Sequence, residues 1–312
     1  MLDPSEIYDV EPDVAGLLDA RTQLTHAGPV LVHAIRGFVD AGNAGQLAAS
    51  HLARALKTTR LATFDVDQLV DYRSRRPTMT FDSTTWSSYA EPELALDLVE
   101  DVAGVPFLLL HGMEPDVQWE RYAAAVLQIV ERFDVPLSLS IHGIPMGVPH
   151  TRPLSVTAHA TRPELVVGYT SWFGAVQVPA SASAFVEYRL GRAGHDAMGF
   201  AVHVPHYLAQ SPSPQASITA LENVQRATGL DLRVGDLAAA AREATEEIDR
   251  QVEASPEVNA VVRALEEQYD SFTRSIGRTN LLAETSDIPT ADELGAEFER
   301  FLAQQGGDGN HP

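Results

Sequence analysis

The sequence contains no cysteine, only one lysine and no long apolar run. The absence of cysteine excludes disulfide bonds, thiolate nucleophiles, iron–sulfur clusters and cysteine-ligated zinc. The apolar stretch at residues 105–110 is far shorter than the roughly 20 residues that a transmembrane helix needs. The acidic N-terminus lacks the basic and apolar regions of a signal peptide. We therefore expect a cytoplasmic protein that needs no metal for folding.

Basic residues are also scarce. The 312 residues include 22 Lys and Arg against 43 Asp and Glu, a formal net charge of −21. Such a field repels nucleic-acid phosphates and anionic lipid headgroups, so neither nucleic acid nor a membrane is an expected partner. Lys57, the one lysine, follows an expected helix with no glycine before it, which argues against a phosphate-loop or Schiff-base role.

Short apolar runs alternate with helical patterns along the first three quarters of the chain. Helices are expected from about residue 45 to 56 and at 119–133, 180–190 and 213–229. Strands are expected at 29–35, 61–66, 107–110, 136–141, 155–158, 165–169 and 197–204. Residues 67–92 are polar and predict an irregular or hairpin excursion. The alternation predicts an α/β fold with a mainly parallel, doubly wound sheet.

The composition changes near residue 236. Three amphipathic helical patterns follow, and residues 236–312 hold 17 acidic and 6 basic residues, a net charge of −11. We therefore predict an N-terminal segment at 1–27, an α/β domain at 28–235, an acidic helical appendage at 236–304 and a disordered tail at 305–312.

The loop after the first expected strand has the glycine spacing of a phosphate loop, at Gly37 and Gly42. Asn43 and Ala44 stand where such a loop has Lys and Ser or Thr, so nucleoside triphosphate binding is not supported. Asp40 also opposes a dinucleotide fingerprint. Two interpretations stay open: Asp40 and Asn43 point into a ligand site, or they cap the next helix.

Several polar residues follow expected strands, where loops of a parallel sheet gather at one edge. They are His111, Glu114, His142, His150, Arg152, His203 and His206. The sequence shows no helical metal-binding pair or facial carboxylate pattern, so we predict no metal and no cofactor. We expect Asp40, His111, His142 and His206 to surround one crevice. No residue can be assigned a catalytic role.

Four segments together carry a family resemblance: GFVDAGNAG at 37–45, GIPMGVPHTRP at 143–153, HVPHYLAQ at 203–210 and ADELGAEFERFL at 291–302. The chain resembles the actinobacterial branch of the proteasome assembly chaperone family, second type, from about residue 28 to 304. The resemblance implies a three-layer αβα sandwich, similar in fold to nucleoside phosphorylases, and a homo-oligomer, with a trimer favoured. Family members that dock on the proteasome often end in a hydrophobic residue, Tyr and any residue, whereas this chain ends Asn310-His311-Pro312.

Two functions are therefore expected. The first is a chaperone-like or scaffolding protein that acts through oligomerisation and protein contacts. The alternative is a small-molecule enzyme or binder of the nucleoside-phosphorylase type that uses the loop-edge pocket, with Arg36 and Arg152 available for an anion.

Overall fold

The computed structural model describes residues 2–25, 27–172 and 174–279. Its main sheet has eight strands in the order β1-β3-β6-β7-β2-β8-β10-β9. The strands are β1 (Tyr8–Val10), β2 (Val30–Arg36), β3 (Lys57–Phe64), β6 (Leu94–Glu100), β7 (Pro106–Met113), β8 (Ser138–Met146), β9 (Val156–Ala160) and β10 (Ala197–Pro205).

The centre of the sheet is parallel. Strands β7, β2, β8 and β10 pair in parallel, and β6 and β9 join them in antiparallel fashion. Strand β3 pairs antiparallel with β6, so it runs in the same direction as the four central strands. The apolar runs in β2, β7 and β10 are typical of strands that are covered on both faces. The mainly parallel sheet predicted from the sequence is thus confirmed.

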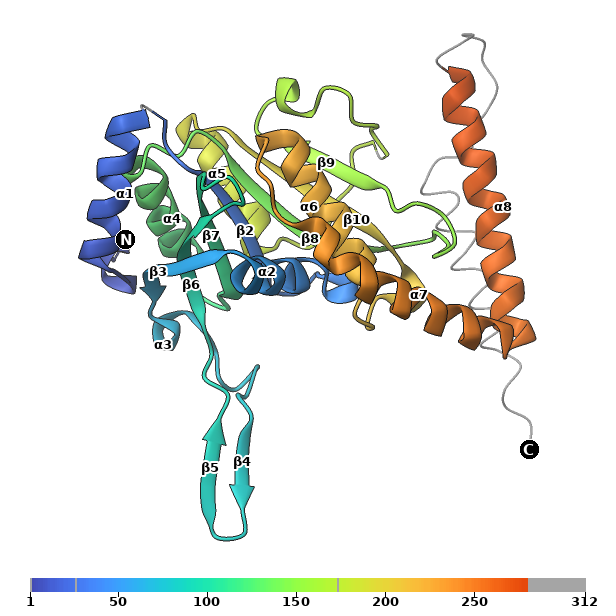
Figure 1. Cartoon of the computed structure of the whole chain (residues 1–312), viewed down its shortest axis with the longest axis horizontal. Helices are drawn as coiled ribbons and strands as arrows, with labels where there is room; N and C mark the ends of the chain where they lie inside the picture. The colour runs from blue at the N-terminus through green and yellow to red at the C-terminus, as the bar shows by residue number, and fades with distance from the viewer. Residues whose placement is uncertain (1, 26, 173, 280–312) are drawn as a thin grey trace.

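Helices cover both faces of this sheet and make three layers (Figure 1). On one face lie α1 (Pro12–Thr25), α4 (Trp119–Arg132) and α5 (Ala182–Ala193), which bury Leu18, Tyr122 and Val186 against the strands. On the other face lie α2 (Ala44–Ala55) and α6 (Pro214–Thr228). The three-layer αβα sandwich is therefore as expected.

Two parts project from the sandwich (Figure 1). Strands β4 (Met79–Asp82) and β5 (Thr85–Tyr89) form a separate antiparallel hairpin, which we call the arm. It follows the single turn α3 (Val66–Leu69). Helices α7 (Ala238–Glu253) and α8 (Pro256–Thr279) continue from α6 and extend past the opposite end of the sheet. In the described part of the chain, no helix is both long and apolar enough to cross a bilayer.

Some sequence predictions differ from the structure. Residues 165–169 are not a strand; Pro163–Val166 is a 3-10 helix, because β9 already occupies the edge of the sheet beside β10. The expected long loop after residue 141 is shorter, since β8 continues to Met146. Strands β1 and β6 and helix α1 were not predicted. The third helix expected in the appendage and the tail lie outside the described residues.

Candidate functional site

Asp40 lies in the loop after β2, where its carboxylate accepts three backbone hydrogen bonds. Oδ1 accepts from the N–H groups of Gly45 (2.9 Å) and Gly143 (3.0 Å), and Oδ2 accepts from that of Gln46 (3.0 Å). Burial raises the pKa of Asp40, although the backbone N–H groups oppose that rise. The side chain thus caps the start of α2 and ties it to β8, which agrees with the capping interpretation.

The glycines of this loop are explained by packing. Gly42 has φ 69°, in the left-handed region. A Cβ on Gly143 would lie 2.0 Å from the carbonyl oxygen of Ala41, so only glycine lets β8 approach the loop. Asn43 precedes α2 with φ 52° and makes no side-chain capping bond. The glycine spacing therefore serves a close approach of two chain segments.

Glu114 is a second carboxylate at this edge and, unlike half-buried Asp40, it is buried. Its Oε2 accepts from the N–H of Phe38 (2.8 Å), and its Oε1 accepts from the N–H of Ala182 at the start of α5 (2.6 Å). The Glu114 side chain therefore joins the loop after β2 to a helix on the opposite face from α2. Both contacts use backbone donors that α5 and the loop cannot satisfy internally.

His142 belongs to a row of histidines beneath α5. It shares one face of the sheet with His33 on β2 and with His159 on β9, and the rings of His142 and His159 are 6.3 Å apart. Glu187 of α5 forms an ion pair with His159 (Nδ1 to Oε2, 2.8 Å). Burial, strengthened by the neighbouring histidines, lowers the pKa values of His33 and His142 to about 4.

His203 and His206 lie beside the same end of β10. His203 Nε2 is 2.8 Å from Thr157 Oγ1, its ring meets that of Trp172 at 4.9 Å, and burial lowers its pKa to about 4. His206 begins the 3-10 helix His206–Leu208 and makes an edge contact with the ring of Tyr207. Both histidines therefore have contacts within the fold.

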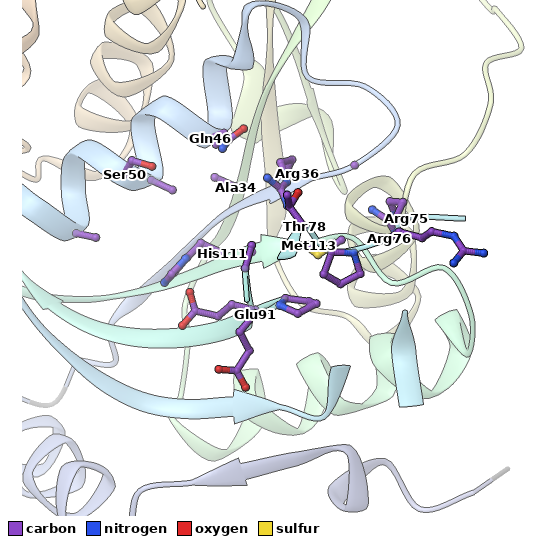
Figure 2. Close-up of a pocket in the computed structure, with 18 residues that line it drawn as sticks. Ala34, Arg36, Gln46, Ser50, Arg75, Arg76, Thr78, Glu91, His111 and Met113 are labelled. Carbon is purple, nitrogen blue, oxygen red and sulfur yellow. The ribbon is translucent and has the colours of Figure 1, made fainter. Parts of the chain in front are cut away.

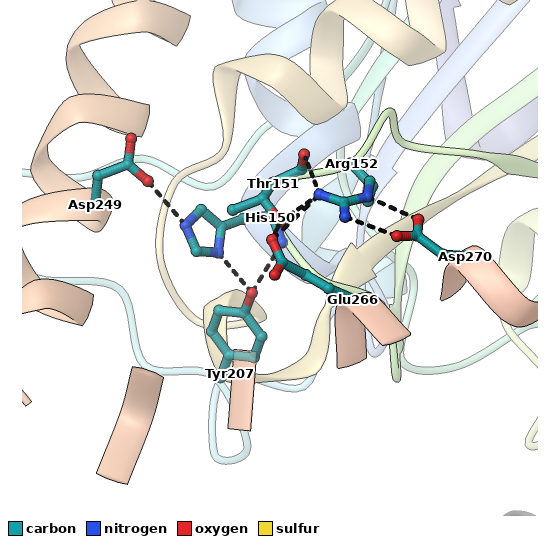
Figure 3. A network of polar contacts seen from close by, with 7 residues as sticks. All are labelled: His150, Thr151, Arg152, Tyr207, Asp249, Glu266 and Asp270. Carbon is teal, nitrogen blue, oxygen red and sulfur yellow. Dashed lines mark hydrogen bonds and ion pairs between the residues drawn. The ribbon is translucent and has the colours of Figure 1, made fainter. Parts of the chain in front are cut away.

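His150 and Arg152 hold the C-terminal helices (Figure 3). His150 Nδ1 is 2.7 Å from the Tyr207 hydroxyl, and His150 Nε2 is 3.1 Å from Asp249 of α7. Arg152 donates two hydrogen bonds to Asp270 of α8 (2.9 and 2.8 Å) and one to Glu266 (3.2 Å). Hydrogen bonding to Asp270 raises the pKa of Arg152 further above its usual range. These two residues link the loop after β8 to α7 and α8.

Arg36 and His111 line a cavity of about 660 Å³ between α2, the ends of β2 and β7, and the base of the arm (Figure 2). His111 Nε2 lies 2.8 Å from Asp97 Oδ2, and Arg60 Nε donates to Asp97 Oδ1 at 2.5 Å. Burial alone would raise the pKa of Asp97, but the hydrogen bonds from His111 and Arg60 outweigh it and leave the pKa below its usual value. Asp97 is therefore ionised and orients the imidazole ring.

The expectation of one shared crevice is wrong. His111 lies on the face of the sheet that α2 covers, whereas His142 lies on the face that α5 covers. Successive side chains of a strand point to opposite faces, and the positions of these two residues in their strands place them on different faces. Asp40 is turned onto the backbone of α2, and His206 lies beyond β10. Of the residues singled out from the sequence, the cavity brings together Arg36 and His111.

Several partners of these residues were not predicted. Asp97 lies on a strand that the sequence pattern did not reveal, and Arg75 and Arg76 lie in the polar stretch at 67–92, to which no site was assigned. Asp249, Glu266 and Asp270 are acidic residues of amphipathic helices, and helical spacing alone does not say which of them meet a distant loop. Only the tertiary contacts identify them.

Comparisons with known proteins were made on the whole chain. A family model described as the PAC2 family matches residues 34–252. A Mycobacterium tuberculosis protein of unknown function, Rv2714, has a solved structure that is 47% identical, with 89% of this chain and 90% of that chain covered and a TM-score of 0.78. A search of curated proteins found no match.

Two further solved structures are similar. A Corynebacterium glutamicum protein of unknown function is 36% identical over 85% of this chain and 97% of that chain, with a TM-score of 0.78. The Mycobacterium tuberculosis proteasome-assembly chaperone homologue Rv2125 is 24% identical over 75% of this chain and 99% of that chain, with a TM-score of 0.69. This last likeness concerns the fold.

Proposed function

The chain belongs to the PAC2 family, and from that premise we propose that it is a chaperone-like or scaffolding protein that acts through protein contacts. The similarity in fold to Rv2125, a proteasome-assembly chaperone homologue, supports this choice of function class. A cytoplasmic location is part of the proposal, and the absence of cysteine agrees with a reducing compartment. The surface of the arm is the observation that carries it.

The arm presents large apolar side chains to solvent. Every residue from 78 to 91 is exposed, and the exposed fractions are 46% for Met79, 57% for Phe81, 65% for Trp86 and 48% for Tyr89. A lone two-stranded hairpin is at best marginally stable in water, and clustered exposed apolar groups mark interaction sites. The arm therefore has the composition of a protein-binding element.

The C-terminal helices offer a second surface of this kind. Helix α8 exposes Val258, Val261 and Phe272, while Val262 and Leu265 are buried. The sequence of α8 around these apolar groups is rich in Asp and Glu, so the surface suits a partner with basic groups around an apolar patch.

A homo-oligomer, specifically a trimer, is the assembly that we propose. The exposed apolar side chains of the arm support self-association, because a second copy that covers them removes apolar surface from water. The choice of a trimer rests on the family resemblance. Light scattering coupled to size exclusion should give a trimer for the natural chain. The double variant Phe81→Ser and Trp86→Ser should give smaller species, while Leu17→Ser, an exposed apolar residue on α1, serves as the matched control.

The chaperone-like role is tested with separately purified α and β subunits of an actinobacterial 20S proteasome. Native mass spectrometry should detect a complex between this protein and the subunits or their assembly intermediate, and the rate of 20S formation should change when the protein is added. The Phe81 and Trp86 variant should lose the complex. No complex and an unchanged assembly rate would reject the proteasome-related role.

The alternative, an enzyme or binder of the nucleoside-phosphorylase type built on Asp40, His142, His150, Arg152 and His206, has weaker support. Asp40 caps a helix, and His150 and Arg152 hold α7 and α8. These residues would have to leave their present contacts to reach a common ligand.

A further inference from the structure

The cavity beside the arm has charged side chains in its lining that pair with no other group in the described part of the protein. Its 660 Å³ lies within the range of roughly 300–1,000 Å³ that is usual for small-molecule sites. One wall is α2, which contributes the small side chains of Ala49, Ser50 and Ala53. The opposite wall is the chain that enters and leaves the arm, at residues 75–78 and 90–93.

The charged side chains of the lining divide into two groups. Arg75 donates to Asp116 at 2.5 Å, and Glu93 pairs with Arg60 at 2.7 Å, so these two are neutralised. Within the described ranges, Arg36 and Arg76 make no ion pair and no side-chain hydrogen bond to the protein. Figure 2 shows Arg36 between Gln46 of α2 and Thr78 at the base of the arm, with Glu91 toward the other end.

A guanidinium that has no partner in the protein favours ligands with a carboxylate or phosphate group. Its planar donors match the oxygens of a carboxylate or phosphate in a two-bond arrangement. The nearby small apolar side chains of Ala34, Ala49 and Ala53 suit the hydrocarbon or ring part of a ligand. Glu91 disfavours a second negative group at the far end, which gives the ligand a direction.

His111 adds a further polar group to the wall. Asp97 engages Nε2, so Nδ1 is the ring nitrogen left for a ligand, and it is an acceptor in the tautomer that donates from Nε2 to Asp97. A ligand hydroxyl or N–H group can donate to this nitrogen. The imidazole orientation is preset by Asp97 and Arg60, so little ordering is needed when a ligand binds.

We propose that this cavity binds a small organic anion, a carboxylate or phosphate ester with an apolar body, whose charged group contacts Arg36 and whose polar substituent contacts His111. The proposal is independent of the chaperone-like function. It assigns a ligand site at the base of the arm, on the α2 face of the sheet and away from the histidines beneath α5.

Three probes of one shape test it: phenyl phosphate, benzoate and the neutral benzyl alcohol, each followed by isothermal titration and thermal shift with the full chain. Phenyl phosphate or benzoate should bind and raise the melting temperature, and benzyl alcohol should not. A preference between the two anions identifies the charged group. Lack of binding by both anions at about 10 mM, where a millimolar site is mostly filled, would overturn the proposal.

Two variants locate the binding. Arg36→Gln should weaken it on the order of 10- to 100-fold, the usual effect of losing a charged hydrogen-bonded pair. Ala53→Phe should block the cavity from the α2 wall and leave Arg36 in place. Arg162→Gln, an exposed arginine paired with Asp196, is the control and should bind as the natural chain does. Equal binding by Arg36→Gln and Ala53→Phe would place the anion elsewhere and refute the site.

Discussion

Carboxylates hold this protein together in two regions with different surroundings. At the edge of the sheet, half-buried Asp40 and buried Glu114 accept hydrogen bonds from backbone N–H groups of separate elements. At the C-terminal helices, Asp270 and Glu266 accept from the guanidinium of Arg152 at the surface. When a mutation removes one partner of such a bond, water can take its place in the surface region but not around the buried carboxylate at the sheet edge. Burial therefore decides how much the same kind of bond stabilises the fold.

The largest expected effect is at Glu114. Glu114→Ala removes both acceptors and leaves the N–H groups of Phe38 and Ala182 without their partner, so we expect a loss of about 3 kcal/mol in the free energy of unfolding. Urea denaturation measures it. Glu120→Ala, an exposed residue at the start of α4, is the control. If Glu114→Ala lowers the free energy of unfolding by less than the control does, burial does not decide how much these carboxylates stabilise the fold.

The histidines beneath α5 predict an acid limit to stability. Burial lowers the pKa of His33 to about 4 from an ordinary 6.5, so the folded state favours the neutral ring. The contribution of His33 to the free energy of unfolding is complete above pH 6.5. It is lost as the pH falls toward 4, and the loss is about 3 kcal/mol. Denaturation at a series of pH values should show this decrease, and His33→Gln should make it shallower. An unchanged pH profile in His33→Gln would assign the decrease to other groups.

Substitutions of Asp40 test whether its carboxylate stabilises the start of α2. The carboxylate accepts from three N–H groups. Two belong to α2, as in a helix cap, and the third belongs to Gly143 of β8, which a helix cap alone would not join. We therefore expect Asp40→Ala to cost about 2 kcal/mol and Asp40→Asn about 1 kcal/mol, because the amide keeps only one acceptor oxygen. Equilibrium unfolding gives both values. If both variants unfold like the natural chain, the carboxylate does not stabilise this edge.

The smallest effect is expected at Arg152. Its ion pairs are partly open to solvent, so Arg152→Ala should lower global stability only slightly. Hydrogen exchange should nevertheless increase in α8, which loses its ion pairs with the loop after β8. Arg250→Ala, which removes an ion pair within α7, is the matched control and should leave the exchange of α8 unchanged. Equal protection of α8 in both variants would mean that its remaining contacts hold it without Arg152.

The sequence predicted the helices better than it predicted contacts between strands. Apolar spacing located α4, and Ser213 and Gly229 marked the ends of α6 as the structure has them. Strand β6 was missed although most of it is buried, because Asp97 and Glu100 interrupt its apolar pattern. Residues 67–92 were expected to be an irregular or hairpin excursion, but nothing local indicated that the arm would stand free of the sandwich.

For the candidate site, the sequence identified residues such as Arg36 and His111, but it did not show which of them lie together in space. His111 and His142 both occur in or after apolar runs, and only the side-chain alternation of each strand decides which face each residue takes. Asp97, which orients His111, is 14 residues away in the chain. Its pairing depends on an antiparallel neighbour that local spacing does not specify.

By itself the sequence determined the fold class, the acidic character and the positions of most helices, because periodicity, capping residues and composition are properties of short segments. The tertiary structure decided the rest. It placed Arg36 and His111 in one cavity, turned Asp40 onto the backbone of α2 and bound Arg152 to α8. Each of these outcomes depends on which distant segments pack together and exclude water, a balance over the whole chain that no single segment contains.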